Sequence, residues 1–290
     1  MCRYSHFFRA FTLICTFVIG GLLCFCIPAA AAAETAEQAD PVHILLIGQD
    51  GRDAETPARA DSILICSFFP DSGKIAMTSF LRDLYVPIPG YPSNRLNAAY
   101  ANGGMTLLRQ TLEENFDLPI DGSIEVDFRQ FSQVLDILGG VTIDLRQDEA
   151  EAINETVPGT LTAGTQLLTG DQALAYTRIR NLDADGDFSR TGRQQKVLSA
   201  LFSSYQGANL FTILSVVPKI LPMLSTDMEQ RQVVSTILQL LPMLSNSTIQ
   251  SHQIPQKDMY SYSTIRGMSV LTADLGDIRK DLEDFLSDNG

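Results

Sequence analysis

The sequence contains no tryptophan, and outside an N-terminal segment it has very few cysteines and histidines. Four of the five cysteines lie within residues 1–33, so the remaining chain cannot form an intramolecular disulfide. The three histidines are far apart and lack the spacing of a zinc site. Cys66 stands in the apolar run SILICSF and is expected to be a small buried hydrophobe. A catalytic pair of Cys66 and His43 is the alternative that the sequence leaves open.

Basic residues are also scarce relative to acidic ones. The 290 residues include 21 Lys and Arg against 34 Asp and Glu, a formal net charge of −13. An acidic surface repels polyanions, so we expect no nucleic-acid partner. The sequence also lacks the GxxxxGK(S/T) phosphate-binding loop, the GxSxG nucleophile elbow and the HExxH zinc motif. These absences argue against the nucleotide-hydrolysing, serine-hydrolase and zinc-protease classes that carry those motifs.

The first 33 residues have the composition of an export segment. Two arginines precede a run without charge that extends to Glu34. This run is long enough to span a bilayer as an N-terminal anchor, while Pro28 and the alanines after it also suit signal-peptide cleavage near Ala33. The arginines before the run predict that the rest of the chain lies outside the cytoplasm in either case. Residues 34–41 are expected to be a polar linker.

Residues 42–290 are predicted to form an α/β domain. Short apolar runs predict buried strands, and the PDSG turn joins two of them. Strands are expected at 42–48, 62–68, 74–80, SIEVDF and GVTIDL, and helices at 95–116, 129–138, 170–180 and 190–205. Because strands and helices interleave, we expect a central mixed sheet flanked by helices on both faces. From about residue 206 to Leu286 the chain is expected to be mostly helical, with one possible strand at 247–254.

Charged residues gather where the first three predicted strands begin and end. Asp50 follows the first strand, Arg59 and Asp61 come just before the second, and Arg82 and Asp83 follow the third. Ligands bind at strand ends in open α/β sheets. Two aspartates suit Mg²⁺, and the planar fork of arginine suits phosphate. The alternative is that these residues form turns and surface ion pairs.

The segment RIRNLDADGDFSRTGRQQ, residues 178–195, resembles both a calcium loop and an anion site. A calcium-binding EF-hand loop that starts at Asp183 needs Gly at position 6 and Glu at position 12. Phe188 and Gln194 stand there instead, so we reject the calcium loop and expect Asp183 and Asp185 in a solvated acidic turn. Arg190 and Gln194 are four residues apart and share a helix face.

Seven blocks of the sequence occur in the order typical of one known family. They are ILLIGQD, ARADSILI, LRDLYVPIPG, RLNAAYANGG, DILGGVTIDL, GTQLLTGDQALAYTRIR and GDFSRTGRQQKVLSAL. From about Val42 to Tyr205 the chain resembles the LytR-CpsA-Psr family, whose members are also labelled cell envelope-related transcriptional attenuators. The resemblance implies a membrane-anchored, extracytoplasmic phosphotransferase of Gram-positive bacteria. It implies that the enzyme moves a glycopolymer, of teichoic acid or capsule type, from a polyprenyl-pyrophosphate carrier onto peptidoglycan. The fold implied holds the lipid tail in a pocket and the pyrophosphate at its mouth.

The resemblance also implies roles for individual residues. The acids associated with Mg²⁺ are Asp50 and Asp61. The residues that the resemblance implies for pyrophosphate binding are Arg59, Arg82, Arg95, Arg178, Arg180, Arg190, Arg193 and Gln194. The catalytic set is Arg82, Asp83, Arg178 and Arg180. Asp187 is expected to orient an arginine, with a role as metal ligand as the alternative, and Phe188 is expected to lie in the core. Three positions depart from the family pattern: Gln49, Leu81 in place of a usual proline, and Arg95 in place of a usual lysine.

Three other functions remain open at this stage. The same residues would serve a pyrophosphatase that transfers the phosphoryl group to water. A non-enzymatic, envelope-linked regulator is a second alternative, although the export segment and the acidic charge oppose direct DNA contact. A glycan-binding module is a third, for which a stripe of surface aromatics would be the signal, and the lack of tryptophan weakens it.

Overall fold

The computed structural model describes residues 39–50, 59–183, 187–208, 210–245 and 247–290. The predicted export segment and most of the linker lie outside this part of the chain. Among the described residues, no helix combines the length and the apolar character that a bilayer span requires.

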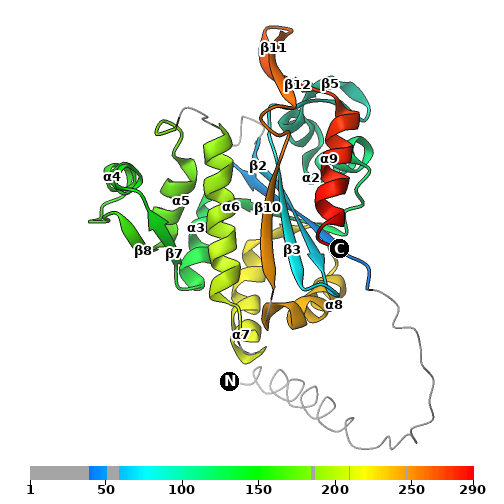
Figure 1. Ribbon diagram of the computed structural model, residues 1–290. Coiled ribbons are helices and arrows are strands. Elements are labelled where there is room, and N and C mark those ends of the chain that lie inside the picture. Colours follow the sequence, from blue (N-terminus) through cyan, green and yellow to red (C-terminus); the bar gives the residue numbers. More distant parts are fainter. Residues whose placement is uncertain (1–38, 51–58, 184–186, 209, 246) are drawn as a thin grey trace, which may run out of the picture. The chain divides into compact units, whose positions relative to one another are not determined.

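The core of the fold is a six-stranded mixed sheet with the strand order β10–β3–β2–β1–β6–β9 (Figure 1). Its strands are β1 (Val42–Gln49), β2 (Ala60–Phe69), β3 (Lys74–Phe80), β6 (Gly122–Asp127), β9 (Ser225–Thr226) and β10 (Thr248–Ile254). The first three strands form an antiparallel meander, as the PDSG turn predicts. β6 runs parallel to β1, and β10 runs parallel to β3. The prediction of a central mixed sheet is therefore confirmed.

Helices cover both faces of this sheet, as the interleaved pattern predicts (Figure 1). One face packs on α2 (Leu96–Phe116) and α9 (Leu275–Ser287), with Leu45 and Ile47 in the shared core. The other face lies under α3 (Phe128–Ile137), α6 (Asp187–Ser204), α7 (Leu210–Ile220) and α8 (Gln230–Leu240). Successive side chains of a strand point to opposite faces, so a sheet covered on both faces needs continuous apolar runs such as those of β1 and β2.

A second, smaller core lies beside the sheet. It contains the hairpin of β7 (Val141–Leu145) and β8 (Gly164–Leu168), with α4 (Gln147–Thr156) and α5 (Gly170–Arg178). Another hairpin, β4 (Tyr85–Ile88) and β5 (Tyr91–Arg95), leads into α2. Short 3₁₀ helices, Leu221–Met223 and Leu241–Ser245, follow α7 and α8.

The prediction for the C-terminal part was wrong in one respect. Besides the helices, the short strand β9 and β10, this part contains a hairpin of β11 (Tyr260–Ile265) and β12 (Met268–Ala273), which projects at the top of Figure 1. Arg266 and Gly267 form its tight turn, with φ of 52° and 77°. Two successive residues with positive φ are what the right-handed twist of a two-residue hairpin requires. The alternating run YSYSTI before an Arg-Gly turn was the signal that could have predicted it.

The hypothesis of a catalytic Cys66–His43 pair was also wrong. Cys66 lies opposite Ile44 in the β1–β2 ladder, and His43 lies opposite Ser67. Neighbouring residues of a strand face opposite sides, so the thiol and the imidazole lie on different faces of the sheet. His43 Nδ1 is 2.8 Å from Ser67 Oγ. Burial lowers the pKa of His43 and raises the pKa of the Cys66 thiol to about 12.

We predict that Cys66 reacts with thiol reagents only when the domain unfolds. The thiol is buried and stays protonated at neutral pH, whereas the thiolate is the reactive species. Residues 39–290 contain no other cysteine, so alkylation of this segment reports on one site. Iodoacetamide at pH 8 is expected to label residues 39–290 in urea and to leave this segment of the folded protein unlabelled. Equal labelling in both conditions would contradict the buried placement.

Candidate active site

The charged residues singled out from the sequence meet at one edge of the sheet. β1, β3 and β6 end at this edge and β2 begins there, because β2 is antiparallel to β1 and β3 while β6 is parallel to β1. Gln49 pairs with both Ala60 and Asp127 across the neighbouring strands. The prediction that Asp50, Asp61 and Arg82 come within reach of one another therefore agrees with the register.

Asp61 is the centre of this group. Its carboxylate forms an ion pair with Arg82 Nη1, and its backbone carbonyl accepts a hydrogen bond from Arg190 Nη2 at 3.2 Å. The Asp61 side chain is only 11% exposed, and Arg190 is buried. Arg190 thus connects α6 to the first residues of β2, and two guanidinium groups converge on one partly buried acid.

Asp83 lies between Arg82 and one further arginine, Arg95. One carboxylate oxygen lies 3.6 Å from Arg82 Nε, and the other accepts a hydrogen bond from Arg95 Nη1 at 3.0 Å. Arg95 directly precedes α2. The first turn of α2 is held by two backbone hydrogen bonds, in which the Leu96 amide donates to the Leu84 carbonyl and the Asn97 amide donates to the Arg82 carbonyl. We call Asp61, Arg82, Asp83, Arg95 and Arg190 the arginine–aspartate cluster. Its geometry agrees with an anion site in which carboxylates hold the guanidinium groups in place.

Asp50 and Arg59 are hydrogen-bonded to each other at the point where the chain leaves β1 and returns to β2. The Asp50 amide donates to the Arg59 carbonyl at 3.3 Å, and the Arg59 amide donates to Asp50 Oδ1 at 3.2 Å. The Arg59 side chain is exposed. The intervening residues 51–58 lie outside the described part of the chain.

The carboxylates of this edge fit the requirements of Mg²⁺ only as a partial ligand set. Within the described ranges no three His, Cys, Asp or Glu side chains are placed to hold a metal ion. Mg²⁺ is commonly held by one or two carboxylates, with phosphate oxygens and water completing the octahedron. Asp50 and Asp61, at the ends of two paired strands, supply hard oxygen donors of this kind. Their predicted role as metal ligands stays a prediction.

An apolar cavity of about 190 Å³ opens next to the cluster, between the sheet and α3, α5 and α6. Its lining includes Leu46, Val126, Phe131, Leu174 and Leu198, with Ser62, Asp127, Thr177 and Gln194 as the polar members. A second cavity of about 280 Å³ lies under α7 and α8 and is lined only by apolar side chains apart from Cys66 and Thr236. Leu46 and Ile124 line both cavities, so the two are neighbours along one face of the sheet.

Two of the predicted residues stand at the wall of the first cavity. Gln194 lines it, four residues from Arg190 on the same helix face, as the spacing predicts. The Arg178 guanidinium lies 4.8 Å from the centre of the Phe128 ring, which is also part of the lining. Arg178 and Arg180 are exposed. A positive charge therefore borders an apolar space. The side chain of Asp187 lies outside the described residues.

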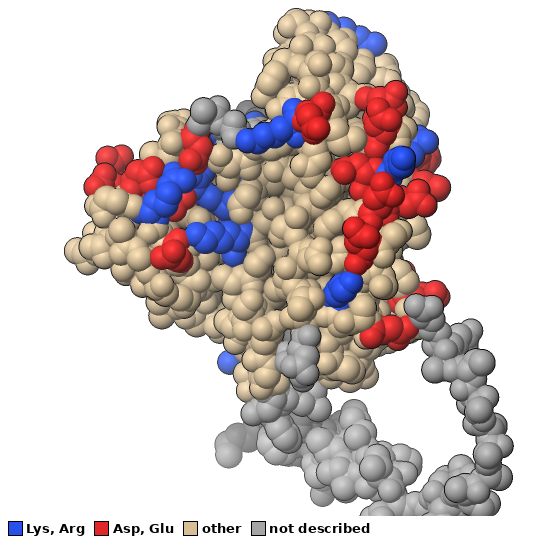
Figure 2. All heavy atoms as spheres, in the orientation of Figure 1, with Lys and Arg blue, Asp and Glu red and all other residues tan. Residues whose placement is uncertain are grey.

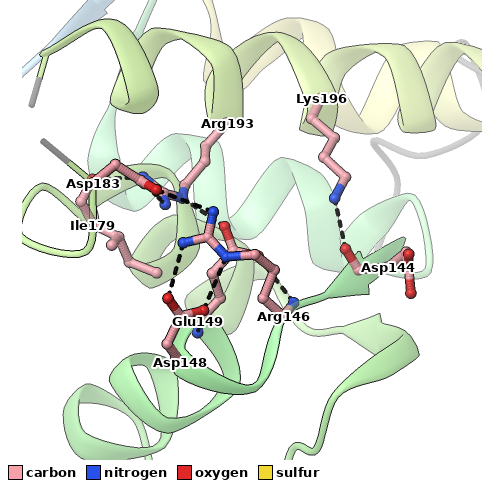
Figure 3. A network of polar contacts seen from close by, with 8 residues as sticks. All are labelled: Asp144, Arg146, Asp148, Glu149, Ile179, Asp183, Arg193 and Lys196. Carbon is pink, nitrogen blue, oxygen red and sulfur yellow. Dashed lines mark hydrogen bonds and ion pairs between the residues drawn. The ribbon is translucent and has the colours of Figure 1, made fainter. Parts of the chain in front are cut away.

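Arg193 has a different environment from the other predicted arginines (Figure 3). Its Nε donates to Glu149 Oε1 at 2.9 Å, its Nη1 donates to the Ile179 carbonyl at 3.3 Å, and its Nη2 pairs with Asp183. The side chains of Arg193 and Glu149 are both only 5% exposed. These partners occupy the guanidinium within the protein, and its role in pyrophosphate binding stays a prediction.

This network corrects the expectation of a solvated acidic turn at Asp183. The Asp183 carboxylate accepts hydrogen bonds from Arg193 and from Arg146, the latter at 3.0 Å (Figure 3). The hydrogen bond from Arg193 is the main reason that the pKa of Asp183 is lowered. The network therefore fixes the start of the segment between α5 and α6, next to Arg178 and Arg180. Glu149 and Arg146 have no signal in the sequence, since only the fold brings α4 next to α6.

Comparisons with known proteins show which family the chain resembles. The model of the LytR_cpsA_psr family matches residues 28–283. A polyisoprenyl-teichoic acid–peptidoglycan teichoic acid transferase, TagU of Bacillus cereus (strain AH820), is 35% identical over 181 residues, which cover 60% of this chain and 58% of the relative. TagU of Bacillus mycoides (strain KBAB4) is 38% identical over 63% of this chain and 58% of its own length. The matching stretch thus spans under two thirds of these relatives.

Solved structures extend the similarity to most of the fold. TagT bound to LIIa-WTA superposes with a TM-score of 0.69 and 27% identity, covering 86% of this chain and 91% of that one. TagT, also called YwtF, with bound octaprenyl pyrophosphate lipid superposes with a TM-score of 0.65 and 26% sequence identity, covering 86% of this chain and 92% of that one. TagT is a protein of B. subtilis.

We predict that Arg193 is important for stability. Arg193→Met leaves Glu149 as a buried charge without its partner, which is expected to cost about 3–5 kcal/mol of unfolding free energy. Arg146→Met is the matched control, because the Arg146 side chain is 50% exposed and surface ion pairs contribute about 0–1 kcal/mol. Urea unfolding of both variants measures the difference. Equal losses would show that the Arg193–Glu149 pair is not the buried support that the structure describes.

Proposed function

The chain belongs to the LytR_cpsA_psr family, and on that premise we propose that it is a phosphotransferase of cell wall assembly. In this proposal it moves a glycopolymer from a polyprenyl-pyrophosphate carrier onto peptidoglycan. The observation that carries the proposal is the arginine–aspartate cluster at the border of an apolar cavity. A polyprenyl pyrophosphate has the same two parts, a dense anion joined to a long hydrocarbon. The relatives that transfer teichoic acid or hold octaprenyl pyrophosphate support this assignment.

The apolar cavities provide the binding energy for the lipid tail. Each methylene moved from water into such a space contributes about 0.8 kcal/mol. The tail enters between α3 and α6 and reaches the second cavity under α7 and α8, because Leu46 and Ile124 line both spaces. The pyrophosphate then lies at the edge of the sheet, within reach of Arg82, Arg178 and Arg190.

The reaction needs positioning and charge neutralisation more than covalent chemistry. A sugar hydroxyl of peptidoglycan attacks the phosphorus that carries the glycopolymer, and a new P–O bond forms. The bond from this phosphorus to the bridging oxygen breaks, and polyprenyl phosphate leaves with the electron pair. Arginines held in advance by Asp61 and Asp83 stabilise the charge that develops on the phosphoryl oxygens. The hydroxyl proton passes to a carboxylate at the same edge.

We also propose Mg²⁺ as the cofactor, with Asp50 and Asp61 as its protein ligands. When bound, the ion neutralises pyrophosphate charge and orients the two phosphates. Asp61 has a carboxylate oxygen besides the one that pairs with Arg82, which supports its assignment to both tasks.

The proposed location is the extracytoplasmic face of the membrane. Residues 1–33 serve as the anchor or signal segment, residues 34–41 as the linker and residues 42–290 as the catalytic domain. The charge pattern of the N-terminus supports this arrangement.

We predict that Arg82→Ala lowers the rate of transfer by about 10²-fold or more, since one lost charge-stabilising donor typically has this effect. The assay contains the protein, a polyprenyl-pyrophosphate sugar, a peptidoglycan oligomer and Mg²⁺, and mass spectrometry detects the phosphodiester product. Arg231→Ala is the control, because Arg231 lies on α8 with its side chain 86% exposed. EDTA is expected to abolish the product. Release of free sugar phosphate without the phosphodiester product would show that the protein is a pyrophosphatase and not a transferase.

We predict that Leu198→Trp blocks binding of the lipid tail. The indole fills the space that Leu198 borders in the first cavity, so the affinity for polyprenyl pyrophosphate is expected to fall more than tenfold, about 1.4 kcal/mol or more. Leu167→Trp is the control, because it makes the same exchange at a side chain that is 63% exposed. This variant should bind polyprenyl pyrophosphate with the affinity of the unaltered protein. Isothermal titration calorimetry measures both. Unchanged affinity in Leu198→Trp would place the tail elsewhere.

A further inference from the structure

Three aromatic side chains form a continuous ridge between α6 and the β11–β12 hairpin. The Phe188 and Tyr260 rings are stacked, with centroids 5.5 Å apart and planes inclined by 21°. Tyr260 meets Tyr262 edge to face, again at 5.5 Å, with an angle of 83°. We call Phe188, Tyr260 and Tyr262 the aromatic ridge. Phe188 was expected in the core, but it is only half-buried and contributes to this surface.

Neighbours of the aromatic ridge contact the arginine–aspartate cluster on two elements, α6 and β12. Phe188 lies in the first turn of α6, two residues before Arg190, which donates to the Asp61 carbonyl. At the other end, Leu271 is the cross-strand partner of Tyr262 and donates its amide hydrogen to the Asp83 carbonyl at 2.9 Å. The ridge therefore borders the edge of the sheet at which the proposed phosphoryl transfer takes place.

The outer end of the ridge is open to solvent. Tyr262 is 74% exposed, the largest exposure among the big apolar side chains of the described residues. A single exposed aromatic is ordinary, but Tyr262 continues a row of rings in which Tyr260 contacts both Phe188 and Tyr262, and contiguous apolar surface of this kind can bind ligands. Tyrosine offers a broad, rigid and amphipathic contact area at a low cost in side-chain entropy.

The surroundings of the ridge contain both hydroxyl and charged side chains. Thr264 and its cross-strand partner Ser269 lie on the same face of the hairpin as Tyr260 and Tyr262, whereas Ser261, Ser263 and Thr272 lie on the opposite face. Figure 2 shows the projecting hairpin as a mostly uncharged surface. At the inner end, Lys257 Nζ lies 5.8 Å from the centre of the Phe188 ring.

We propose that the aromatic ridge binds the glycan strand of the peptidoglycan acceptor and directs one of its hydroxyl groups to the arginine–aspartate cluster. This inference rests on the proposed transferase function and names the place of its second substrate. A pyranose ring has an apolar face of C–H groups, which stacks on an aromatic ring, and a rim of hydroxyls, which bond to Ser and Thr side chains. The ridge and its surroundings offer both.

A membrane surface is the main competing partner for exposed tyrosines. Insertion into a bilayer interface is favoured by a large apolar face and by Lys and Arg that attract anionic lipids. The hairpin carries one basic side chain, Arg266 in its turn, and the helix that follows it, α9, carries four acidic side chains against Arg279 and Lys280. Figure 2 shows acidic side chains gathered over that helix. The local charge therefore favours a glycan over an anionic lipid surface.

The test compares the full-length chain in detergent with Tyr262→Ala and Tyr262→Phe. The probe is a soluble N-acetylglucosamine oligomer, and binding is measured by calorimetry without any donor lipid. Tyr262→Ala is expected to weaken binding about tenfold or more, while Tyr262→Phe keeps the ring and retains most of the affinity. Tyr91→Ala is the matched control, since Tyr91 is 48% exposed on the separate β5 strand. In the transfer assay, Tyr262→Ala should raise KM for the acceptor and leave KM for the lipid donor unchanged.

The outcomes separate this inference from the proposed function. The protein could bind the oligomer through Tyr262 and yet show no transferase activity. This result would support the ridge as a glycan site and contradict the proposed transferase function. If Tyr262→Ala transfers the glycopolymer with an unchanged KM for the acceptor, the ridge is not the acceptor site, although the proposed transferase function is kept. Loss of binding to anionic lipid vesicles in Tyr262→Ala, with oligomer binding unchanged, would assign the ridge to the membrane and overturn the inference.

Discussion

The register of β1 against its two neighbours is the constraint on which the rest of the structure depends. β2 runs antiparallel to β1, and β6 runs parallel to it, so one edge of the sheet receives the end of β1, the start of β2 and the end of β6. That edge collects the aspartates and arginines. The same pairing leaves Leu46 and Ile124 on one face, where they line the apolar cavities. A shift of one residue would exchange the two faces and separate the charged edge from the cavity.

Carboxylates at this edge hold the arginines before any ligand arrives. Asp61 holds Arg82, Asp83 lies between Arg82 and Arg95, and the Glu149–Arg193–Asp183 network fixes the segment next to Arg178 and Arg180. A site arranged in advance loses little free energy to reorganisation when charge develops on a phosphate. The acidic residues of the site therefore have two tasks, since they orient the guanidinium groups and, in our proposal, hold the metal ion.

The sequence predicted the parts of this structure that depend on local pattern. The apolar runs of β1, β2 and β3 were sufficient to predict three strands, and the PDSG turn to predict the connection of β2 to β3. The positions of Asp50, Asp61 and Arg82 at strand ends were sufficient to expect a shared edge. The β11–β12 hairpin was missed because its short alternating runs stand among helical segments. The contacts of Arg193 could not be predicted, because Glu149 is 44 residues away and only the packing of α4 on the second core brings it near. The cavity was expected from family resemblance alone, since apolar residues that line a space and those that fill a core have the same composition.

The central claim is that one amphiphilic ligand spans the arginine–aspartate cluster and the adjoining cavity. The most direct test is an experimental structure of the protein with a polyprenyl pyrophosphate bound. The account predicts pyrophosphate oxygens within hydrogen-bonding distance of Arg82 and Arg178, and a hydrocarbon tail between α3 and α6 in contact with Leu198. A lipid bound on another surface, or a pyrophosphate held away from this edge of the sheet, would contradict it.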